Sequence, residues 1–318
     1  MPTVVITETL ADEAADWLGR HAELVWCPHD KPAELREALK SADAIVVRTY
    51  TQVDDALLDL APNLKVVGRA GVGLDNIDLD ACERRGVPVV YTPDANTQAV
   101  VEYVFGLILD ELRPRTNLPD AVTPETFHAL RKSEVGKQLD HLSLGILGFG
   151  RIGKRVGQVA HAIGIKLHVC DLLPEAQLRN AVDYPFEFCS HEDLYASSQI
   201  VTVHVDGRPS NRHLIGQAEL DKLHDPCLLI NTARGMLVDP AALAEWAKRR
   251  TTCRAVLDVH DPEPPSADYV LYRQPNVRLL PHLAARTNEA LANMSWVVRD
   301  VHAVLEGKEP RFPAVVSS

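Results

Sequence analysis

The fold of this chain is decided by the stretch Ser143-Leu144-Gly145-Ile146-Leu147-Gly148-Phe149-Gly150-Arg151-Ile152-Gly153. Five apolar or small residues come first and predict a short buried strand. Glycines at 148, 150 and 153 follow in the spacing G-x-G-x-x-G, and the apolar positions after them have helical periodicity. The stretch therefore predicts a strand, a glycine turn and the start of a helix.

Each glycine of this spacing has a physical role in holding a dinucleotide. Gly148 permits the tight turn, Gly150 lets the backbone approach a pyrophosphate, and Gly153 lets the helix pack on the strand. The free N–H groups of the helix start then face the phosphates. A second strand from 165 to 170 ends at Asp171, the distance at which an acidic residue holds a ribose 2′-hydroxyl. Asp171 would repel a 2′-phosphate, so the sequence favours NAD over NADP.

Strands alternate with helices on both sides of this stretch, which predicts parallel sheets wound by helical crossovers. We expect an α/β protein of two doubly wound parallel-sheet domains. Residues 1–98 and 284–318 form a discontinuous substrate-binding domain, and residues 99–283 form the dinucleotide-binding domain. The final helix is expected to run from about 287 to 306. The segment 113–142 is expected to be irregular and to make a dimer contact.

Composition excludes several classes of protein. The 318 residues include 33 basic and 44 acidic ones, a net charge of −11 with no long basic run. This balance argues against a nucleic-acid surface and a polybasic membrane patch, and no apolar stretch is long enough to span a bilayer. The six cysteines form no C-x-x-C pair, which favours reduced thiols in a cytoplasmic protein, and we identify no metal-ligand set.

Three polar stretches follow strands in the second half of the chain, where the carboxyl ends of parallel strands bind ligands. Arg234 can hold a carboxylate with its planar fork. Glu263 lies in an acidic, proline-rich loop that begins at Asp258. His282 can exchange a proton near neutral pH. Taken singly, each also fits a structural role: a surface arginine, an acidic loop, a satisfied histidine. Together they fit hydride transfer to a 2-oxo acid, which needs a carboxylate clamp, a proton donor and a group that keeps the donor protonated.

At this point the sequence resembles the D-2-hydroxyacid dehydrogenase family, most of all its phosphoglycerate dehydrogenase branch, over nearly the whole chain. Six motifs match in order: Val47-Arg48-Thr49, the loop from Val66 to Asp78, the glycine fingerprint, Asn-x-x-Arg-Gly at 231, Asp-x-x-x-x-Glu-Pro at 258, and Pro-His-x-Ala-x-x-Thr at 281. The resemblance implies a flavodoxin-like substrate domain and a Rossmann NAD domain with a cleft between them. It also implies a homodimer that binds a small 2-oxo or 2-hydroxy acid.

The resemblance also implies roles for single residues. His282 would exchange the proton, Glu263 would hydrogen-bond His282 and hold it protonated, and Arg234 would bind the substrate carboxylate. The residues expected at the cofactor are Gly148, Gly150, Arg151, Ile152, Gly153, Asp171, Val205, Thr232, Ala233 and Asp258, the last three on the nicotinamide side. The residues expected at the substrate are Arg48, Val72 and Gly73, and Arg48 suggests a second anionic group.

Some positions depart from the family pattern. Asp206 replaces a proline near the expected adenine pocket, and His141 stands where glycine is usual, so both raise the question of how tightly the cradle holds NAD. Arg286 replaces a small residue close to His282 and fits either an anionic substrate or a surface pair. Two alternative functions stay open: a phosphite dehydrogenase on the same scaffold, and a non-catalytic protein that senses NAD(H). Formate oxidation is disfavoured because the partner of the histidine is Glu263 and not a glutamine.

Overall fold

The computed structural model describes residues 1–315 of the chain, which divide into two compact units. Unit 1 comprises residues 1–96 and 285–318, and unit 2 comprises residues 97–284. Unit 1 is therefore made from two separate pieces of sequence. Within the described range, no helix is both long and apolar enough to cross a membrane.

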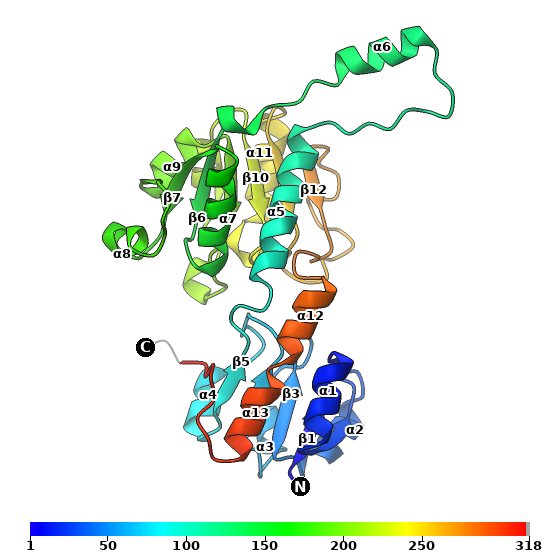
Figure 1. Cartoon of the computed structure of the whole chain (residues 1–318), viewed down its shortest axis with the longest axis vertical. Helices are drawn as coiled ribbons and strands as arrows, with labels where there is room; N and C mark the ends of the chain where they lie inside the picture. The colour runs from blue at the N-terminus through cyan, green and yellow to red at the C-terminus, as the bar shows by residue number, and fades with distance from the viewer. Residues whose placement is uncertain (316–318) are drawn as a thin grey trace. The chain divides into compact units, whose positions relative to one another are not determined.

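Unit 1 is a five-stranded parallel sheet with helices on both faces (Figure 1). Its strands are β1 (Thr3–Ile6), β2 (Glu23–Trp26), β3 (Ala44–Val47), β4 (Val66–Arg69) and β5 (Val89–Tyr91), and its helices are α1 (Asp12–Gly19), α2 (Pro32–Leu39), α3 (Asp55–Asp59), α4 (Leu79–Arg84), α12 (Asn288–Ser295) and α13 (Val298–Leu305). The strand order is β2-β1-β3-β4-β5, the flavodoxin-like order. The predicted fold class is confirmed for this unit.

Two apolar clusters cover the two faces of this sheet. One joins the sheet to α2, α3 and α4, and the other joins it to α1 and α13. The second cluster depends on the last helix, because Val301 of α13 lies directly over Gly68 of β4. A Cβ atom at position 68 would be 2.4 Å from Val301 Cγ2. The C-terminal piece of the chain is thus part of the core of unit 1.

Unit 2 is a seven-stranded parallel sheet. Its strands are β6 (Ser143–Leu147), β7 (Lys166–Cys170), β8 (Glu187–Phe188), β9 (Ile200–Val203), β10 (Leu228–Asn231), β11 (Arg254–Leu257) and β12 (Val277–Leu279), and its helices are α5 (Thr97–Leu112), α6 (Pro124–Ser133), α7 (Arg151–Ala162), α8 (Glu175–Arg179), α9 (His191–Ser197), α10 (Gln217–Lys222) and α11 (Pro240–Arg249). The order β12-β11-β10-β9-β6-β7-β8 is that of a Rossmann sheet with one strand added at an edge. The predicted Rossmann fold is confirmed, and all six cysteines are free thiols.

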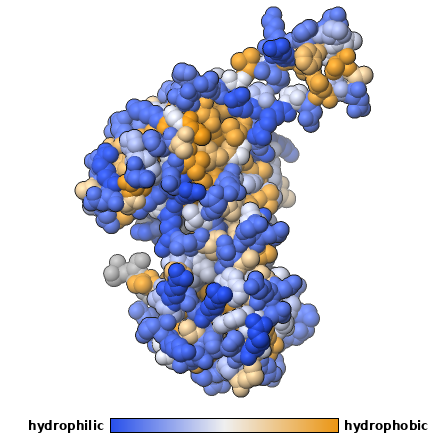
Figure 2. All heavy atoms as spheres, viewed as in Figure 1, coloured by the Kyte–Doolittle hydropathy of each residue, from blue (hydrophilic) through white to orange (hydrophobic). Residues whose placement is uncertain are grey.

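The segment 113–142 differs from the prediction that it is irregular throughout. It contains α6, which has Pro124 in its first turn. The helix begins after the N-cap Thr123, whose hydroxyl accepts the Thr126 N–H. No residue of α6 is buried, and the helix stands away from the sheet of unit 2 (Figure 1). Apolar side chains on either side of α6 are among the most exposed of the molecule (Figure 2): Leu118 is 55% and Val135 79% exposed. We call residues 113–142 the arm.

The prediction of one helix over 287–306 is wrong, because the chain forms two helices that meet at Trp296 and Val297. The Ser295 hydroxyl donates to Leu291 O at 2.8 Å, a bond to the preceding turn that often bends helices. The same hydroxyl accepts the Ala11 N–H at 2.9 Å, which ties the bend to the start of α1. The apolar periodicity continues through the bend, so the sequence pattern gave no sign of it.

Candidate active site

Most of the predicted site residues of unit 2 lie at the carboxyl edge of its sheet. The glycine turn follows β6, Asp171 follows β7, Val205 lies beyond β9 and Thr232 follows β10. Asp258 and Glu263 come after β11, and His282 comes after β12. Since all seven strands are parallel, their carboxyl ends meet at one edge, which is where such sheets bind ligands. The fold thus brings the predicted cofactor and catalytic residues of this unit to the same edge.

The glycine turn is shaped for close approach of backbone and ligand. Gly148 has a φ of 89°, a conformation that other residues rarely adopt. A Cβ atom at Gly153 would be 2.2 Å from Gly148 O, so α7 could not pack on the turn with any side chain there. A Cβ atom at Gly150 would meet nothing within 4 Å, so this glycine leaves open space beside the first turn of α7. These features fit a pyrophosphate at the helix start.

Asp171 is tied to the glycine turn by its carboxylate. It accepts the Phe149 N–H at 2.6 Å and the Leu173 N–H at 2.8 Å. The acid that is predicted to hold a ribose therefore also fixes the turn that is predicted to hold the phosphates. Sequence reasoning missed this second role, because a contact between two loops 22 residues apart follows from the strand pairing of β6 and β7.

Two departures from the family pattern have simple structural outcomes. The Asp206 carboxylate receives Arg208 Nε at 2.7 Å and Arg208 Nη2 at 2.5 Å, and the bond to Arg208 is the largest effect that lowers the pKa of Asp206. Its charge is thus compensated by a neighbour. His141 ends a 3₁₀ turn (Leu139–His141) before β6, a strand of five residues that spans roughly 16 Å. It lies at the amino end of β6, opposite the glycine turn, so it cannot touch the cradle.

The Arg234 loop is held by an internal amide. Asn231 Nδ2 donates to Arg234 O at 2.8 Å, and Asn231 Oδ1 accepts the Ala233 N–H at 3.0 Å. Arg234 Nη1 donates to Ala233 O at 2.7 Å. The buried hydroxyl of Thr232 has no hydrogen-bond partner in the described structure, so it is available to a ligand at this strand end. An unpartnered buried hydroxyl is costly unless a bound group or water satisfies it.

His282 and Glu263 form the predicted pair. The distance from His282 Nδ1 to Glu263 Oε2 is 2.8 Å, and the histidine side chain is 44% exposed. Burial raises the pKa of Glu263, but the hydrogen bonds from His282 and from the His260 N–H outweigh burial and leave this pKa below its usual value. The carboxylate is therefore ionised at neutral pH. His282 Nδ1 is engaged by Glu263, which leaves Nε2 for a substrate.

His282 is held in an unusual backbone conformation. Its φ is 57°, in the left-handed region that a non-glycine residue seldom occupies. The two residues that follow are fixed by Asp258, whose oxygens accept the Leu283 and Ala284 N–H groups at 2.8 Å each. Asp258 O also accepts the His282 N–H at 2.8 Å. Asp258 has no exposed surface. Its observed contacts hold the His282 turn.

The predicted substrate residues lie in unit 1, after β3 and β4. Within residues 1–315 the N–H groups of Val72 and Gly73 make no hydrogen bond. Glu8 fixes the loop after β3, since its carboxylate accepts the N–H groups of Arg48 at 3.1 Å, Thr49 at 2.8 Å and Tyr50 at 3.0 Å. The Arg48 guanidinium is half-buried and has no acidic side chain within ion-pair distance in the described range. Burial and the positive charge of Arg286 lower the pKa of Arg48. These two arginines of unit 1 therefore lie close enough for their charges to interact.

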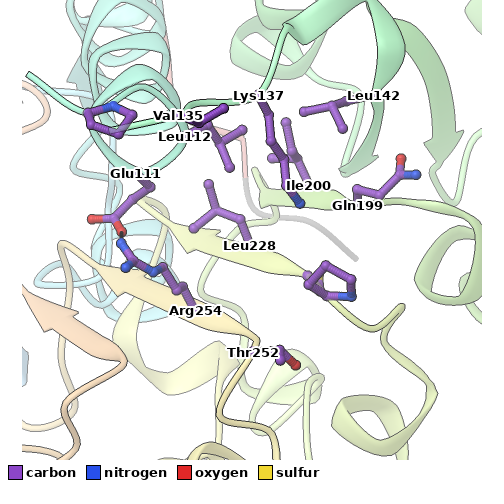
Figure 3. Close-up of a pocket in the computed structure, with 13 residues that line it drawn as sticks. Glu111, Leu112, Val135, Lys137, Leu142, Gln199, Ile200, Leu228, Thr252 and Arg254 are labelled. Carbon is purple, nitrogen blue, oxygen red and sulfur yellow. Dashed lines mark hydrogen bonds and ion pairs between the residues drawn. The ribbon is translucent and has the colours of Figure 1, made fainter. Parts of the chain in front are cut away.

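A pocket of about 280 Å³ opens at the opposite, amino edge of the unit 2 sheet (Figure 3). It is lined by the starts of β9, β10 and β11 and by the two ends of the arm, and Arg254 Nη1 on its wall donates to Glu111 Oε2 at 2.7 Å. None of the residues that the sequence singles out for catalysis or cofactor binding lines it. The predicted catalytic and cofactor residues of unit 2 thus lie at the other edge of the sheet from this pocket.

Comparison with known proteins places the chain. Residues 105–284 match the family model described as D-isomer specific 2-hydroxyacid dehydrogenase, NAD binding domain. The chain belongs to this family. NAD is accordingly the cofactor for which the carboxyl edge of unit 2 is built, and the open space at Gly150 and the free Thr232 hydroxyl fit such a group.

Relatives within the 2-hydroxyacid dehydrogenase family carry different names. A D-3-phosphoglycerate dehydrogenase from Archaeoglobus fulgidus is 34% identical over 298 residues, 93% of this chain and 56% of that protein. A glyoxylate reductase from Aeropyrum pernix is 31% identical over 318 residues, 97% of this chain and 94% of that protein. The crystal structure of the TT0316 protein from Thermus thermophilus has a TM-score of 0.85 at 31% identity and covers 98% of this chain and 100% of that one. The chain spans about half the length of the phosphoglycerate dehydrogenases that it matches.

Proposed function

We propose that this protein is an NAD-dependent oxidoreductase that interconverts a D-2-hydroxy acid and its 2-oxo acid. The observation that carries the proposal is the His282–Glu263 pair, joined at 2.8 Å and placed at the same sheet edge as the glycine turn. A histidine held by a carboxylate is the pair that proton transfer to or from a hydroxyl group needs. Arg234, on the neighbouring strand end, supplies a planar cation for a carboxylate.

The roles follow from the positions of these side chains. In oxidation His282 Nε2 takes the proton of the substrate hydroxyl while the hydride leaves C2, and the C–O bond becomes a carbonyl. In reduction His282 returns that proton to the carbonyl oxygen as the hydride arrives. Glu263 stabilises the imidazolium that forms in oxidation, because its own pKa is lowered and it stays ionised. Bound NAD supplies the acceptor or donor of the hydride.

The cofactor residues in this proposal lie at the carboxyl edge of unit 2. Gly148, Gly150, Arg151, Ile152 and Gly153 form the turn and helix start for the pyrophosphate. Asp171 holds the adenosine ribose, while Val205, Thr232 and Ala233 line the rest of the dinucleotide. Asp258 completes this set on the nicotinamide side, while its carboxylate also holds the His282 turn.

We propose that unit 1 is the substrate-binding domain and unit 2 the dinucleotide-binding domain. Support comes from the N–H groups of Val72 and Gly73, which make no hydrogen bond in the described range. Successive backbone N–H groups of this kind form anion-binding concavities. They suit an oxygen of the substrate carboxylate.

The substrate is proposed to carry a second anionic group, such as a phosphate. Arg48 and Arg286 support this, since burial and the charge of Arg286 lower the pKa of Arg48 even though the Glu8 carboxylate raises it, and a bound anion would favour both cations. Loss of either arginine should therefore weaken the binding of a dianionic substrate more than the binding of a monoanionic one.

The activity is tested by following NADH absorbance with glyoxylate, hydroxypyruvate, phosphohydroxypyruvate and phosphite. We expect turnover of at least one 2-oxo acid. The His282→Ala variant should lose about 10²- to 10⁴-fold in kcat, while its Kd for NADH, from fluorescence titration, should stay close to that of the parent. A fully active His282→Ala protein would remove the acid–base role, and turnover of phosphite alone would replace the substrate class.

The second anionic group is tested with Arg286→Ser. The ratio of kcat/KM for phosphohydroxypyruvate to kcat/KM for glyoxylate should fall about tenfold, the equivalent of one charge-assisted contact. Arg36→Ser, which removes an exposed arginine on α2, is the matched control and should not move this ratio. An unchanged ratio in Arg286→Ser would show that Arg286 is a surface residue without a ligand.

We further propose that the protein is a cytoplasmic homodimer. The free thiols support a reducing compartment. The arm supports a dimer, because a ten-residue helix without buried residues is too short to be stable in isolation. A second copy offers a self-complementary partner for such an arm.

A further inference from the structure

His260 lies beside the Glu263–His282 pair, at an unspecified position of the Asp-x-x-x-x-Glu-Pro motif, and the sequence analysis assigned it no role. It follows β11 by three residues and is 9% exposed. Its ring Nε2 lies 2.8 Å from Leu280 O, on the segment that leads from β12 to His282. Its backbone N–H donates to Glu263 Oε1 at 2.8 Å. One residue therefore contacts both the carboxylate of the pair and the chain that carries the histidine.

The hydrogen-bond partner fixes which nitrogen of His260 carries the proton. A carbonyl oxygen can only accept, so Nε2 is the donor. The other nitrogen, Nδ1, is buried and has no hydrogen-bond partner in the described structure. An unpartnered buried nitrogen costs free energy, which a phenylalanine at this position would avoid. The ring also meets Tyr269 edge to face, with centroids 5.8 Å apart, and an apolar ring would make the same contact. The bond to Leu280 is therefore the feature that only a side-chain donor provides.

We propose that His260 is a positioning residue that holds Glu263 and His282 together by linking the loop after β11 to the segment after β12. The inference rests on the proposed function, since it assigns His260 a part in the acid–base step. The two segments are joined on one side by the Glu263–His282 bond and on the other by the His260–Leu280 bond, 2.8 Å each. Each carboxylate oxygen of Glu263 has one partner, the His260 N–H for Oε1 and the His282 ring for Oε2, so the orientation of the carboxylate is fixed.

The surroundings explain why such a link is needed. His282 is in the left-handed region, and its turn is held by Asp258 from below. Glu263 lies five residues after Asp258, in an irregular loop. The loop is also held close by Gly235 of the Arg234 motif, where a Cβ atom would be 2.0 Å from His260 O. His260 is thus the point where the arginine loop, the glutamate loop and the histidine segment meet.

The experiment compares His260→Phe with His260→Gln. Phenylalanine keeps the ring and removes the donor, whereas glutamine keeps an N–H that can reach Leu280 O. We expect kcat to fall about tenfold in His260→Phe, as for a small misplacement of reacting groups, with an unchanged Kd for NADH. When Glu263 is held less firmly, its carboxylate stabilises the imidazolium of His282 less. The pH at which the rate of reduction falls to half should therefore move to a lower value. His260→Gln should restore both quantities to near the parent's.

A second readout does not depend on turnover. The Cε1–H signal of His282, assigned with His282→Ala, is followed by NMR against pH in the parent and both variants. The charges of Asp258 and His260 interact with this pair, and of these two residues only His260 changes. The midpoint should move to lower pH in His260→Phe and return in His260→Gln. If His260→Phe does not fold, His260→Val removes the same donor.

The outcomes separate this inference from the function. Equal midpoints and equal kcat in the parent and in His260→Phe would overturn the positioning role and leave the dehydrogenase proposal intact. A shifted midpoint in a protein that turns over no 2-oxo acid would support the link while removing the proposed activity. A loss in His260→Phe that His260→Gln does not restore would mean that ring packing, and not the donor, matters.

Discussion

Carboxylates that accept backbone N–H groups recur at the strand ends of this protein. Asp171 fixes the glycine turn, Asp258 fixes the turn after His282, and Glu8 fixes the loop after β3. An anion that accepts several N–H groups makes strong, directional bonds. The acids that a sequence motif suggests as ligands therefore also build the loops that carry the ligands. This double use is invisible in the sequence because the partners are backbone atoms of distant segments.

Asp171 allows the two uses to be separated. Asp171→Asn keeps an oxygen for the Phe149 N–H but removes the charge that repels a 2′-phosphate. We expect the ratio of kcat/KM with NAD to kcat/KM with NADP to fall about tenfold, which corresponds to about 1.4 kcal/mol. Steady-state kinetics with both cofactors measure it, and Asp206→Asn, a neighbouring acid already neutralised by Arg208, is the control. An unchanged ratio would take the ribose contact away from Asp171.

The elements show how far the sequence predicts the fold and where it fails. Both sheets follow from the alternation of apolar strands and amphipathic helices, and the strands that carry Arg234, Glu263 and His282 lie where the pattern places them. The helix α6 was missed although Thr123 and Pro124 give a start signal, since its residues have no apolar face directed at a core. The bend at Trp296 and the short edge strand β8 depend on tertiary hydrogen bonds, which no local pattern records.

The histidine that follows β9, His204, predicts how the stability of the fold depends on pH. Burial lowers the pKa of His204, which follows β9, to about 3. An unfolded histidine has a pKa of about 6.5. As the pH falls below about 6.5, the unfolded chain takes up a proton that the folded chain refuses, so this site destabilises the fold progressively toward pH 3.

Urea unfolding at pH 7 and at pH 5 measures the effect. We expect the midpoint to drop between the two values in the parent and to drop less in His204→Gln, which cannot be protonated. His141→Gln removes an exposed histidine of the same unit and should behave like the parent. Equal drops in all three proteins would show that the charged form of His204 is tolerated in the folded state.

At the scale of the whole molecule, the exposed apolar arm supports the proposed homodimer. We expect sedimentation to give about 70 kDa, twice the 35.1 kDa of one chain. Leu118 and Phe127 are 55% and 40% exposed. The substitutions Leu118→Asp and Phe127→Asp should dissociate the dimer, because the interface would bury an unpaired charge, which is costly. Lys132→Asp also introduces an aspartate, on the side of α6 away from Phe127 and Leu130, and should leave the dimer intact. A parent that sediments as a monomer would contradict the assembly.

Because unit 2 is inserted into unit 1, the ribosome delivers the parts of this protein in an unusual order. Residues 1–96 emerge first, yet their sheet lacks α13, whose Val301 covers Gly68. Unit 2 is continuous, so it can complete its core while the first 96 residues still have one uncovered apolar face. The sheet of unit 1 is then completed only when α13, which is made after unit 2, packs on it. A nascent chain stopped before residue 285 should for that reason be the form most dependent on chaperones.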